Sequence, residues 1–123
     1  MRSLKPPWTP SEATDEIGAM ARSSRLALSY KLHARERLAE RDIILSDVLY
    51  VLRNGFVYSD AVPATKPGYH KYVIEGRSPN SGTRALGVLV IPDKEACLLK
   101  IVTVMWMDDV QGRAGTIVGE ADD

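Results

Sequence analysis

Residues 97–107 read Cys-Leu-Leu-Lys-Ile-Val-Thr-Val-Met-Trp-Met, the most hydrophobic stretch of this 123-residue chain. Such an apolar run predicts a strand that is buried on both faces and central in its sheet. Two further strand-like segments precede it, over 69–76 and 84–91, and the turns that connect the three, at 78–82 and 92–96, are short. Short connections join neighbouring strands in opposite directions, so we expect an antiparallel meander.

Upstream of the meander the patterns are mostly helical. We expect helices over 10–23, 33–41 and 46–54, the last ending at a glycine that follows an asparagine. Large apolar side chains recur at every second residue over 25–32, which favours a short strand, although a helix that merges this stretch into the next element competes with it. Another short strand is expected over 56–59.

Helices first and strands after predict an α+β domain, with the N-terminal helices packed on one face of a four-stranded or five-stranded antiparallel sheet. The length supports one core. We expect a single domain over 10–107, an extended proline-containing arm over 1–9, and a flexible acidic tail over 108–123.

Composition excludes several classes of protein. Lys+Arg and Asp+Glu are both 16, yet between residues 17 and 107 there are 13 basic and 8 acidic side chains, so the balanced total hides a basic middle that suits an anionic partner. One cysteine and two histidines argue against a disulfide framework and a metal centre, and we expect no cofactor. Without an apolar run of about 20 residues or a secretory leader, we expect a cytoplasmic protein with no membrane contact.

The segment His33-Ala-Arg-Glu-Arg-Leu-Ala-Glu-Arg41 carries the most chemistry. On a helix, His33, Arg37 and Arg41 lie within roughly 80° of one another, which makes a strip of one imidazole and two guanidinium groups. Guanidinium groups bind phosphate oxygens, and a histidine exchanges protons near neutral pH. The competing interpretation is an ordinary solvated helix surface with Arg–Glu pairs.

A second group of candidates interleaves aromatic and cationic side chains, as RNA-binding surfaces do by stacking bases and contacting phosphates. It consists of the run Tyr69-His70-Lys71-Tyr72 together with Arg77 and Arg84. The alternative is a sheet edge kept soluble by its charges. In the apolar last strand, Lys100 and Thr103 are the polar interruptions, and strict alternation places them on opposite faces. Lys100 there either reaches an anion or extends its head group to water.

The run Leu28-Ser29 followed by His33-Ala34-x-x-Arg37-x-x-x-Arg41-Asp42-Ile43 resembles a signature, S-x-H-A-x-x-R-x-x-x-R-G-I, of the uncharacterised family called domain of unknown function 4258. Here three residues rather than one separate the serine from the histidine, and an aspartate replaces the usual glycine. The helix that ends near a glycine and the segment Ile-Val-Thr-Val at 101–104 resemble later parts of the family, so the resemblance spans roughly residues 25–106.

Such families resemble RelE-like and BrnT-like bacterial toxins, which are small α+β ribonucleases. The resemblance implies a RelE-like fold and a metal-independent endoribonuclease toxin of a toxin–antitoxin system. In that interpretation His33 is the general acid or base, Arg37 and Arg41 clamp the phosphate, and Thr103 completes the catalytic set. The implied partners are RNA, in some cases ribosome-bound, and an antitoxin protein, and the chain is a monomer or a homodimer.

Three alternatives remain open at the level of the sequence. The same scaffold serves as a non-catalytic RNA- or protein-binding module, or its sheet face is an interface in an assembly. In the third, the recurring residues are structural, with His33 and Arg37 hydrogen-bonding the last strand and Thr103 as their partner.

Overall fold

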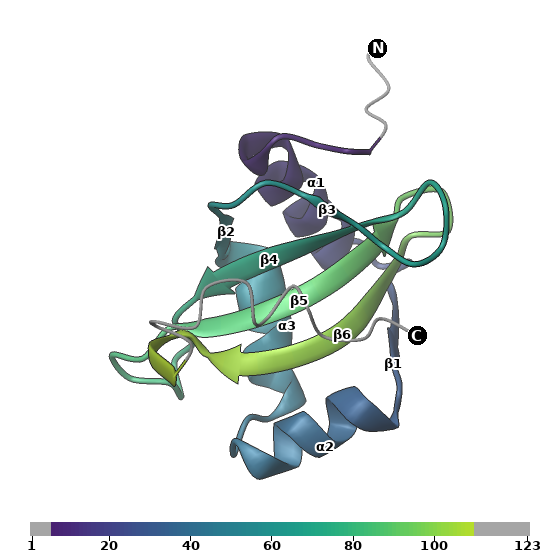
Figure 1. Ribbon diagram of the computed structural model, residues 1–123. Helices are drawn as coiled ribbons and strands as arrows, with labels where there is room; N and C mark the ends of the chain where they lie inside the picture. The colour runs from purple at the N-terminus through teal and green to yellow at the C-terminus, as the bar shows by residue number, and fades with distance from the viewer. Residues whose placement is uncertain (1–5, 110–123) are drawn as a thin grey trace.

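The computed structural model describes residues 6–109, which form an α+β domain (Figure 1). In chain order the elements are α1 (Pro10–Arg22), β1 (Ala27–Tyr30), α2 (Leu32–Glu40), α3 (Leu45–Asn54), β2 (Phe56–Val57), β3 (Val62–Pro63), β4 (His70–Gly76), β5 (Leu86–Asp93), β6 (Leu98–Trp106) and a 3-10 turn (Met107–Asp109). The three expected helices and the expected strands are present, and β3 is an addition inside the segment that was expected to be a loop.

Local signals in the sequence place the first helix. Thr9 precedes Pro10 and closes a capping box, in which the Thr9 hydroxyl accepts from the backbone N–H of Glu12 at 3.2 Å. In return, the Glu12 carboxylate accepts from the backbone N–H of Thr9 at 3.0 Å. Two donors that the first turn leaves unpaired are thereby satisfied, which fixes the start of α1.

The sheet is mixed rather than antiparallel. Its strand order is β1-β6-β5-β4-β2, with β3 paired to β4, and β4, β5 and β6 form the expected antiparallel meander. β1, however, pairs with β6 in parallel, from Ala27↔Leu98 to Tyr30↔Ile101. The expectation of an all-antiparallel sheet was wrong because the chain between these two strands includes two helices and the other strands, and alternation within β1 carries no information on its direction.

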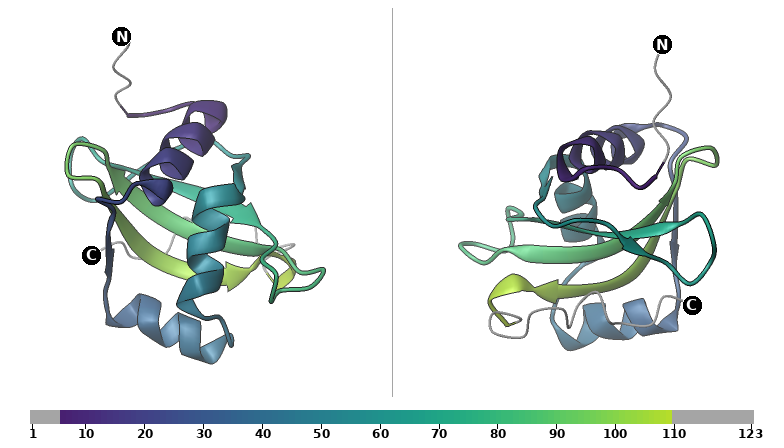
Figure 2. Two further views of the ribbon diagram at one scale, coloured as in Figure 1. Left: turned by 180° about the vertical axis from the view of Figure 1, so that it is seen from behind. Right: turned by 45° about the horizontal axis from the view of Figure 1, so that its top comes forward.

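The helices do not share one face of the sheet. Seen from behind in Figure 2, α1 and α3 cross the face of the sheet, as expected, whereas α2 lies beyond β6. β1 pairs with β6 only over the first part of that strand, and α2 lies beside the remainder. Ala34 of α2 is buried in the same core as the apolar side chains of α1 and α3. α2 therefore covers this core at the edge of the sheet, whereas α1 and α3 cover it across the face.

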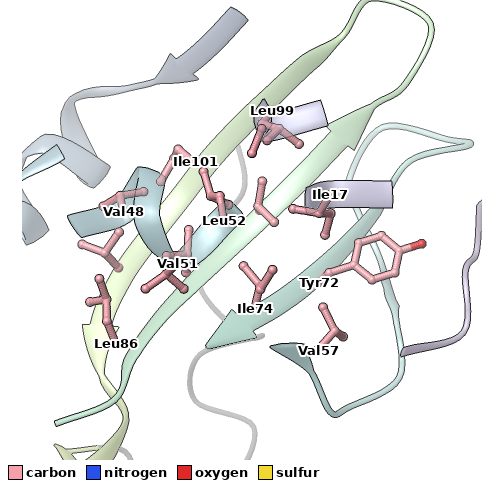
Figure 3. Close-up of a cluster of buried hydrophobic side chains, with 14 of the residues drawn as sticks. Ile17, Val48, Val51, Leu52, Val57, Tyr72, Ile74, Leu86, Leu99 and Ile101 are labelled. Carbon is pink, nitrogen blue, oxygen red and sulfur yellow. The ribbon is translucent and has the colours of Figure 1, made fainter. Parts of the chain in front are cut away.

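The main core lies between the sheet and the helices α1 and α3 (Figure 3). Its largest fully buried side chains come from both helices and from the central strands: Ile17, Val48, Val51, Leu52, Tyr72, Ile74, Leu86 and Leu99. A second apolar cluster lies on the other face of the sheet and comprises Val73, Leu89, Ile91, Val102 and Met105. The sheet is therefore apolar on both faces, as the near-continuous apolar pattern of β5 and β6 predicts.

A bulge in β6 changes which residues share a face. Ile101 pairs with Val90 and Thr103 pairs with Leu89, so Val102 is an extra residue between them. Lys100 pairs with Ile91, whose side chain lies in the second cluster, and Leu89 lies in that cluster too. Lys100 and Thr103 therefore lie on the same face, and the expectation that they lie on opposite faces was wrong because a bulge resets the alternation.

The described part of the expected N-terminal arm contacts the domain. Trp8 is only 3% exposed, its ring stacks on that of Tyr72 at a centroid distance of 5.5 Å, and its backbone N–H donates to the Tyr72 hydroxyl at 2.8 Å. At the other end, Asp108 and Asp109 are described, and the rest of the expected acidic tail lies outside the described residues. Among residues 6–109 no helix has the length and apolar character that crossing a bilayer requires.

Candidate functional site

The strip expected on α2 is largely engaged with the protein itself. The Arg41 guanidinium donates to the backbone carbonyl of Val104 at 2.6 Å, and the indole N–H of Trp106 donates to the Arg41 carbonyl at 2.9 Å. These two bonds tie the end of α2 to β6. Arg41 is therefore an anchor between a helix and a strand, and its head group points at the sheet rather than outward at a polyanion.

The other two residues of the strip lie near the surface. Arg37 pairs with Glu40 one turn further on, with nitrogen and oxygen 3.1 Å apart, and its side chain is 25% exposed. This is the i,i+3 pair of a solvated helix surface, worth a few tenths of a kcal/mol. His33 is half-buried in the first turn of α2. The geometry of the three head groups thus differs from the outward row that a straight helix predicts, because Arg41 follows the last residue of α2 and serves as its C-cap.

Burial corrects three further candidates. Tyr72 is 1% exposed and its hydroxyl is bonded to Trp8, Thr103 is fully buried, and Lys71 is 8% exposed. A group without accessible surface cannot contact RNA, so Tyr72 and Thr103 are core residues and Lys71 offers almost no surface. The Thr103 hydroxyl has no hydrogen-bond partner within the described chain, so it is not the structural partner of α2 either.

The remaining candidates are scattered over the molecule. The Arg84 guanidinium binds both carboxylate oxygens of Asp108, at 2.7 and 2.9 Å, and lies 4.4 Å from the centre of the Trp106 ring. Lys100 is half-buried beside a small cavity at the other end of β6. Arg77 is exposed just after β4 and lines a cavity at the end of that strand.

That cavity has a volume of about 500 Å³ and lies where α3, β2 and β4 meet. We call it the aromatic groove, because three exposed aromatic side chains line it. Tyr50 is 40% exposed, Phe56 55% and Tyr58 69%. The Phe56 and Tyr58 rings lie 6.2 Å apart at an angle of 35°. The other lining residues are Asn54, Gly55, Glu75, Gly76, Arg77, Thr83 and Ala85.

The backbone explains how these side chains come together. Phe56 pairs with Glu75 across β2 and β4, which places the ring and the carboxyl side by side on one face. Gly55 lets the end of α3 approach β4 closely, since a Cβ atom there would lie 2.6 Å from the carbonyl oxygens of Glu75 and Val51. Because that approach is close, Tyr50 and Asn54 of α3 reach the groove.

Glu75 is the acidic group of the groove. It is half-buried, and desolvation raises its pKa above the usual 4.5. The carboxyl therefore holds a proton at higher pH than an exposed glutamate does. In its ionised form it accepts hydrogen bonds, and in its protonated form it donates one, so it suits either recognition of amino groups or proton transfer.

Sequence reasoning placed only Arg77 in this groove. The other side chains were missed because they come from three elements, none of which carries a recognisable motif. One signal was present: Phe56 and Tyr58 are two residues apart in the strand expected over 56–59, and alternation there places both opposite Val57, whose side chain belongs to the core. Among residues 6–109 there is no group of three or more His, Cys, Asp or Glu side chains arranged to hold a metal ion.

Comparison with known proteins places the chain in a family. Neither the curated proteins nor the solved structures include a match. The sequence model of one family, described as a domain of unknown function, DUF4258, matches residues 30–106, which run from the end of β1 to the end of β6. The matched region is more than half of the chain and includes α2, the meander and all residues of the aromatic groove. The chain therefore belongs to the DUF4258 family.

Proposed function

We propose that this protein binds single-stranded RNA and that the bases lie in the aromatic groove. The observation that supports this most is that Tyr50, Phe56 and Tyr58 are exposed around one cavity together with Arg77. Exposed aromatic clusters are uncommon on a surface without a partner. Every base has a face that stacks on such rings, and an adjacent guanidinium binds phosphate.

Glu75, the acidic residue that lines the groove, also suits the recognition of a base. The ionised carboxylate of Glu75 accepts hydrogen bonds from an amino group, as acidic side chains do from the amino group of cytosine. Because Glu75 lies beside Phe56, a base stacked on that ring presents its edge to the carboxylate. The groove therefore favours bases that carry an exocyclic amino group over uracil.

Binding is tested by fluorescence anisotropy with a labelled octacytidylate. Phe56→Ala combined with Tyr58→Ala removes the rings, and Leu32→Ala, at a residue that is 68% exposed outside the groove, is the matched control. We expect a loss of about 1–3 kcal/mol per stacked base, which is roughly 5- to 150-fold in affinity. Equal affinity of the double variant and the wild type would end the proposal.

A second candidate function is metal-independent RNA cleavage, as in a toxin ribonuclease. Glu75 favours it, because a carboxyl whose pKa is raised lies in the same groove as an arginine. In such a reaction the 2′-oxygen attacks the adjacent phosphorus and loses its proton to the Glu75 carboxylate. The bond to the 5′-oxygen breaks, that oxygen takes a proton from water, and Arg77 balances the charge on the phosphorane.

Cleavage is tested with purified protein and RNA in EDTA, comparing wild type, Glu75→Gln and His33→Ala. Loss in Glu75→Gln alone assigns the acid/base role to the groove, whereas loss in His33→Ala alone assigns it to α2. Intact RNA with the wild type removes the enzymatic candidate and leaves the binding function standing. A toxin role further predicts growth arrest on expression in a bacterial cytoplasm, relieved by an antitoxin partner.

A further inference from the structure

A second cavity adjoins the aromatic groove. It has a volume of about 280 Å³ and shares three lining residues with the groove, namely Asn54, Gly55 and Phe56. Its other lining residues are Thr14, Asp15, Ala19, Arg22 and Arg53, from the C-terminal parts of α1 and α3 and from the first half of α1. The two cavities therefore lie on either side of one short stretch of backbone that links α3 to β2.

Two arginines dominate this second cavity, and contacts between the helices hold both of them. The Arg22 guanidinium donates to the carbonyl of Arg53 and, at 3.5 Å, to the side-chain oxygen of Asn54. The Arg53 guanidinium donates through Nε to the carbonyl of Ala21 at 3.1 Å. Both side chains are exposed. Because a guanidinium has five N–H donors, these contacts fix the two groups and still leave donors for a ligand.

The charge of the cavity favours an anion. Two guanidinium groups face a single lining carboxylate, that of Asp15, and the hydroxyl of Thr14 is already used, since it donates to the Pro10 carbonyl at 2.9 Å and accepts from the Val57 N–H at 2.8 Å. A planar fork of donors at each arginine matches the oxygens of a phosphate better than it matches a spherical anion.

We infer that the RNA strand continues from the aromatic groove into this second cavity, where Arg22 and Arg53 bind a phosphate of the same strand. The inference rests on the proposed function. It defines the ligand as a strand long enough to reach both cavities, with a base stacked at Phe56 and Tyr58 and the backbone passing over Asn54. Asn54 is exposed between the cavities, so its amide lies at the point where the strand crosses.

The competing explanation is purely structural. Cations in the last turn of a helix interact favourably with its free carbonyls, and Arg22 and Arg53 both occupy last turns. In that case the two arginines stabilise α1 and α3 and make no contact with RNA. The two explanations differ in how RNA affinity depends on salt, because each phosphate contact adds a fixed increment to that dependence.

The experiment measures the slope of log affinity against log salt concentration for an octacytidylate and for a dicytidylate. Arg53→Gln removes the charge, Arg53→Lys retains it, and Arg22→Gln is a second charge removal. Arg25→Gln is the matched control, since Arg25 is exposed and does not line the cavity. Thermal unfolding of each variant is recorded so that the comparison is made between folded proteins.

We expect Arg53→Gln and Arg22→Gln each to reduce the slope for the octanucleotide by about 0.7, the increment for one contact with a single strand. Arg53→Lys and Arg25→Gln keep the wild-type slope, and the dinucleotide, which fills the groove alone, shows no difference. Wild-type slopes in both glutamine variants, or an equal fall in Arg25→Gln, would overturn the inference and leave RNA binding in the groove intact. Failure of the wild type to bind either RNA would instead remove the proposed function.

Discussion

At the scale of the residue, Arg41 shows how a charged side chain acts as part of a sheet edge. β1 covers the outer edge of β6 only as far as Ile101, so among residues 6–109 the later carbonyls of β6 have no strand partner on that side. The Arg41 guanidinium satisfies one of them, that of Val104. The guanidinium of this C-cap residue thereby makes a hydrogen bond of the kind that a neighbouring strand makes, and it holds α2 beside this part of the sheet edge.

Arg41→Ala is therefore expected to reduce stability. A hydrogen bond from a charged donor contributes about 1.5–3 kcal/mol, and the partner carbonyl would lose its only described donor on that edge. Urea denaturation measures the loss, with Arg25→Ala as an exposed control. If Arg41→Ala unfolds at the same urea concentration as the control, the anchor is unimportant and a role for Arg41 at a ligand becomes the better explanation.

Glu75 gives a prediction on pH. Burial raises its pKa in the folded state, so between the unfolded value near 4.5 and the raised value the folded protein binds more protons than the unfolded chain. The contribution of Glu75 to stability is present below that window and is lost as the pH rises through it. Glu75→Gln cannot titrate, so its melting temperature should fall less than that of the wild type over the same rise in pH. If the melting temperatures of both proteins change equally over that rise in pH, this assignment is contradicted.

At the scale of the element, the sequence predicts boundaries well because local chemistry sets them. The capping box at Thr9 starts α1, and α3 ends at Asn54, directly before the glycine at which the helix was expected to stop. Three features were not predictable by the same means: the direction of β1, the bulge at Val102 and the position of α2 beside β6. Each depends on pairing between residues far apart in the chain, which a periodic pattern does not encode.

Gly55 is also the residue through which α3 approaches β4. In Gly55→Ala the new methyl group would lie 2.6 Å from two carbonyl oxygens of the backbone, which cannot yield as a flexible side chain would. We expect α3 to withdraw from β4, at a cost of about 1–3 kcal/mol in stability, and the aromatic groove to widen. Chemical denaturation together with RNA titration measures both effects. Wild-type values in both would show that the close approach is not needed.

At the scale of the whole molecule, the segment over residues 6–9 is part of the domain through Trp8. Its ring is buried against Tyr72, 64 positions away in sequence, and the Tyr72 hydroxyl accepts its backbone N–H. Trp8→Ala should lower the free energy of unfolding by about 3–5 kcal/mol, the usual range for a buried tryptophan. Tyr72→Phe, which keeps the ring and removes the acceptor, should lower it by about 1–3 kcal/mol. A Trp8→Ala protein as stable as the wild type would mean that the segment is dispensable.

The candidate site was hardest to predict because it is assembled at this largest scale. Helical spacing put His33, Arg37 and Arg41 in one row, and that part of the geometry needs no tertiary structure. What the spacing cannot show is that α2 lies against β6, which turns Arg41 inward. The aromatic groove, by contrast, leaves no pattern in the local sequence. Tyr50 and Glu75 come from separate elements, and they line one cavity because β2 pairs with β4 and α3 ends beside both strands.

The surface of α2 and the aromatic groove thus have different expected roles, since α2 supports the fold and the groove is the site that we propose for RNA. Variants at each surface test this division. His33→Ala combined with Arg37→Ala changes α2, and Phe56→Ala combined with Tyr58→Ala changes the groove. Because Phe56 and Tyr58 are more than half exposed, the groove variant should keep its stability and lose affinity for RNA. The α2 variant should keep its affinity wherever it remains folded. Denaturation curves and RNA titrations on both proteins show which surface binds RNA. A fall in affinity confined to the α2 variant would assign the functional site to α2 and leave the groove as ordinary surface.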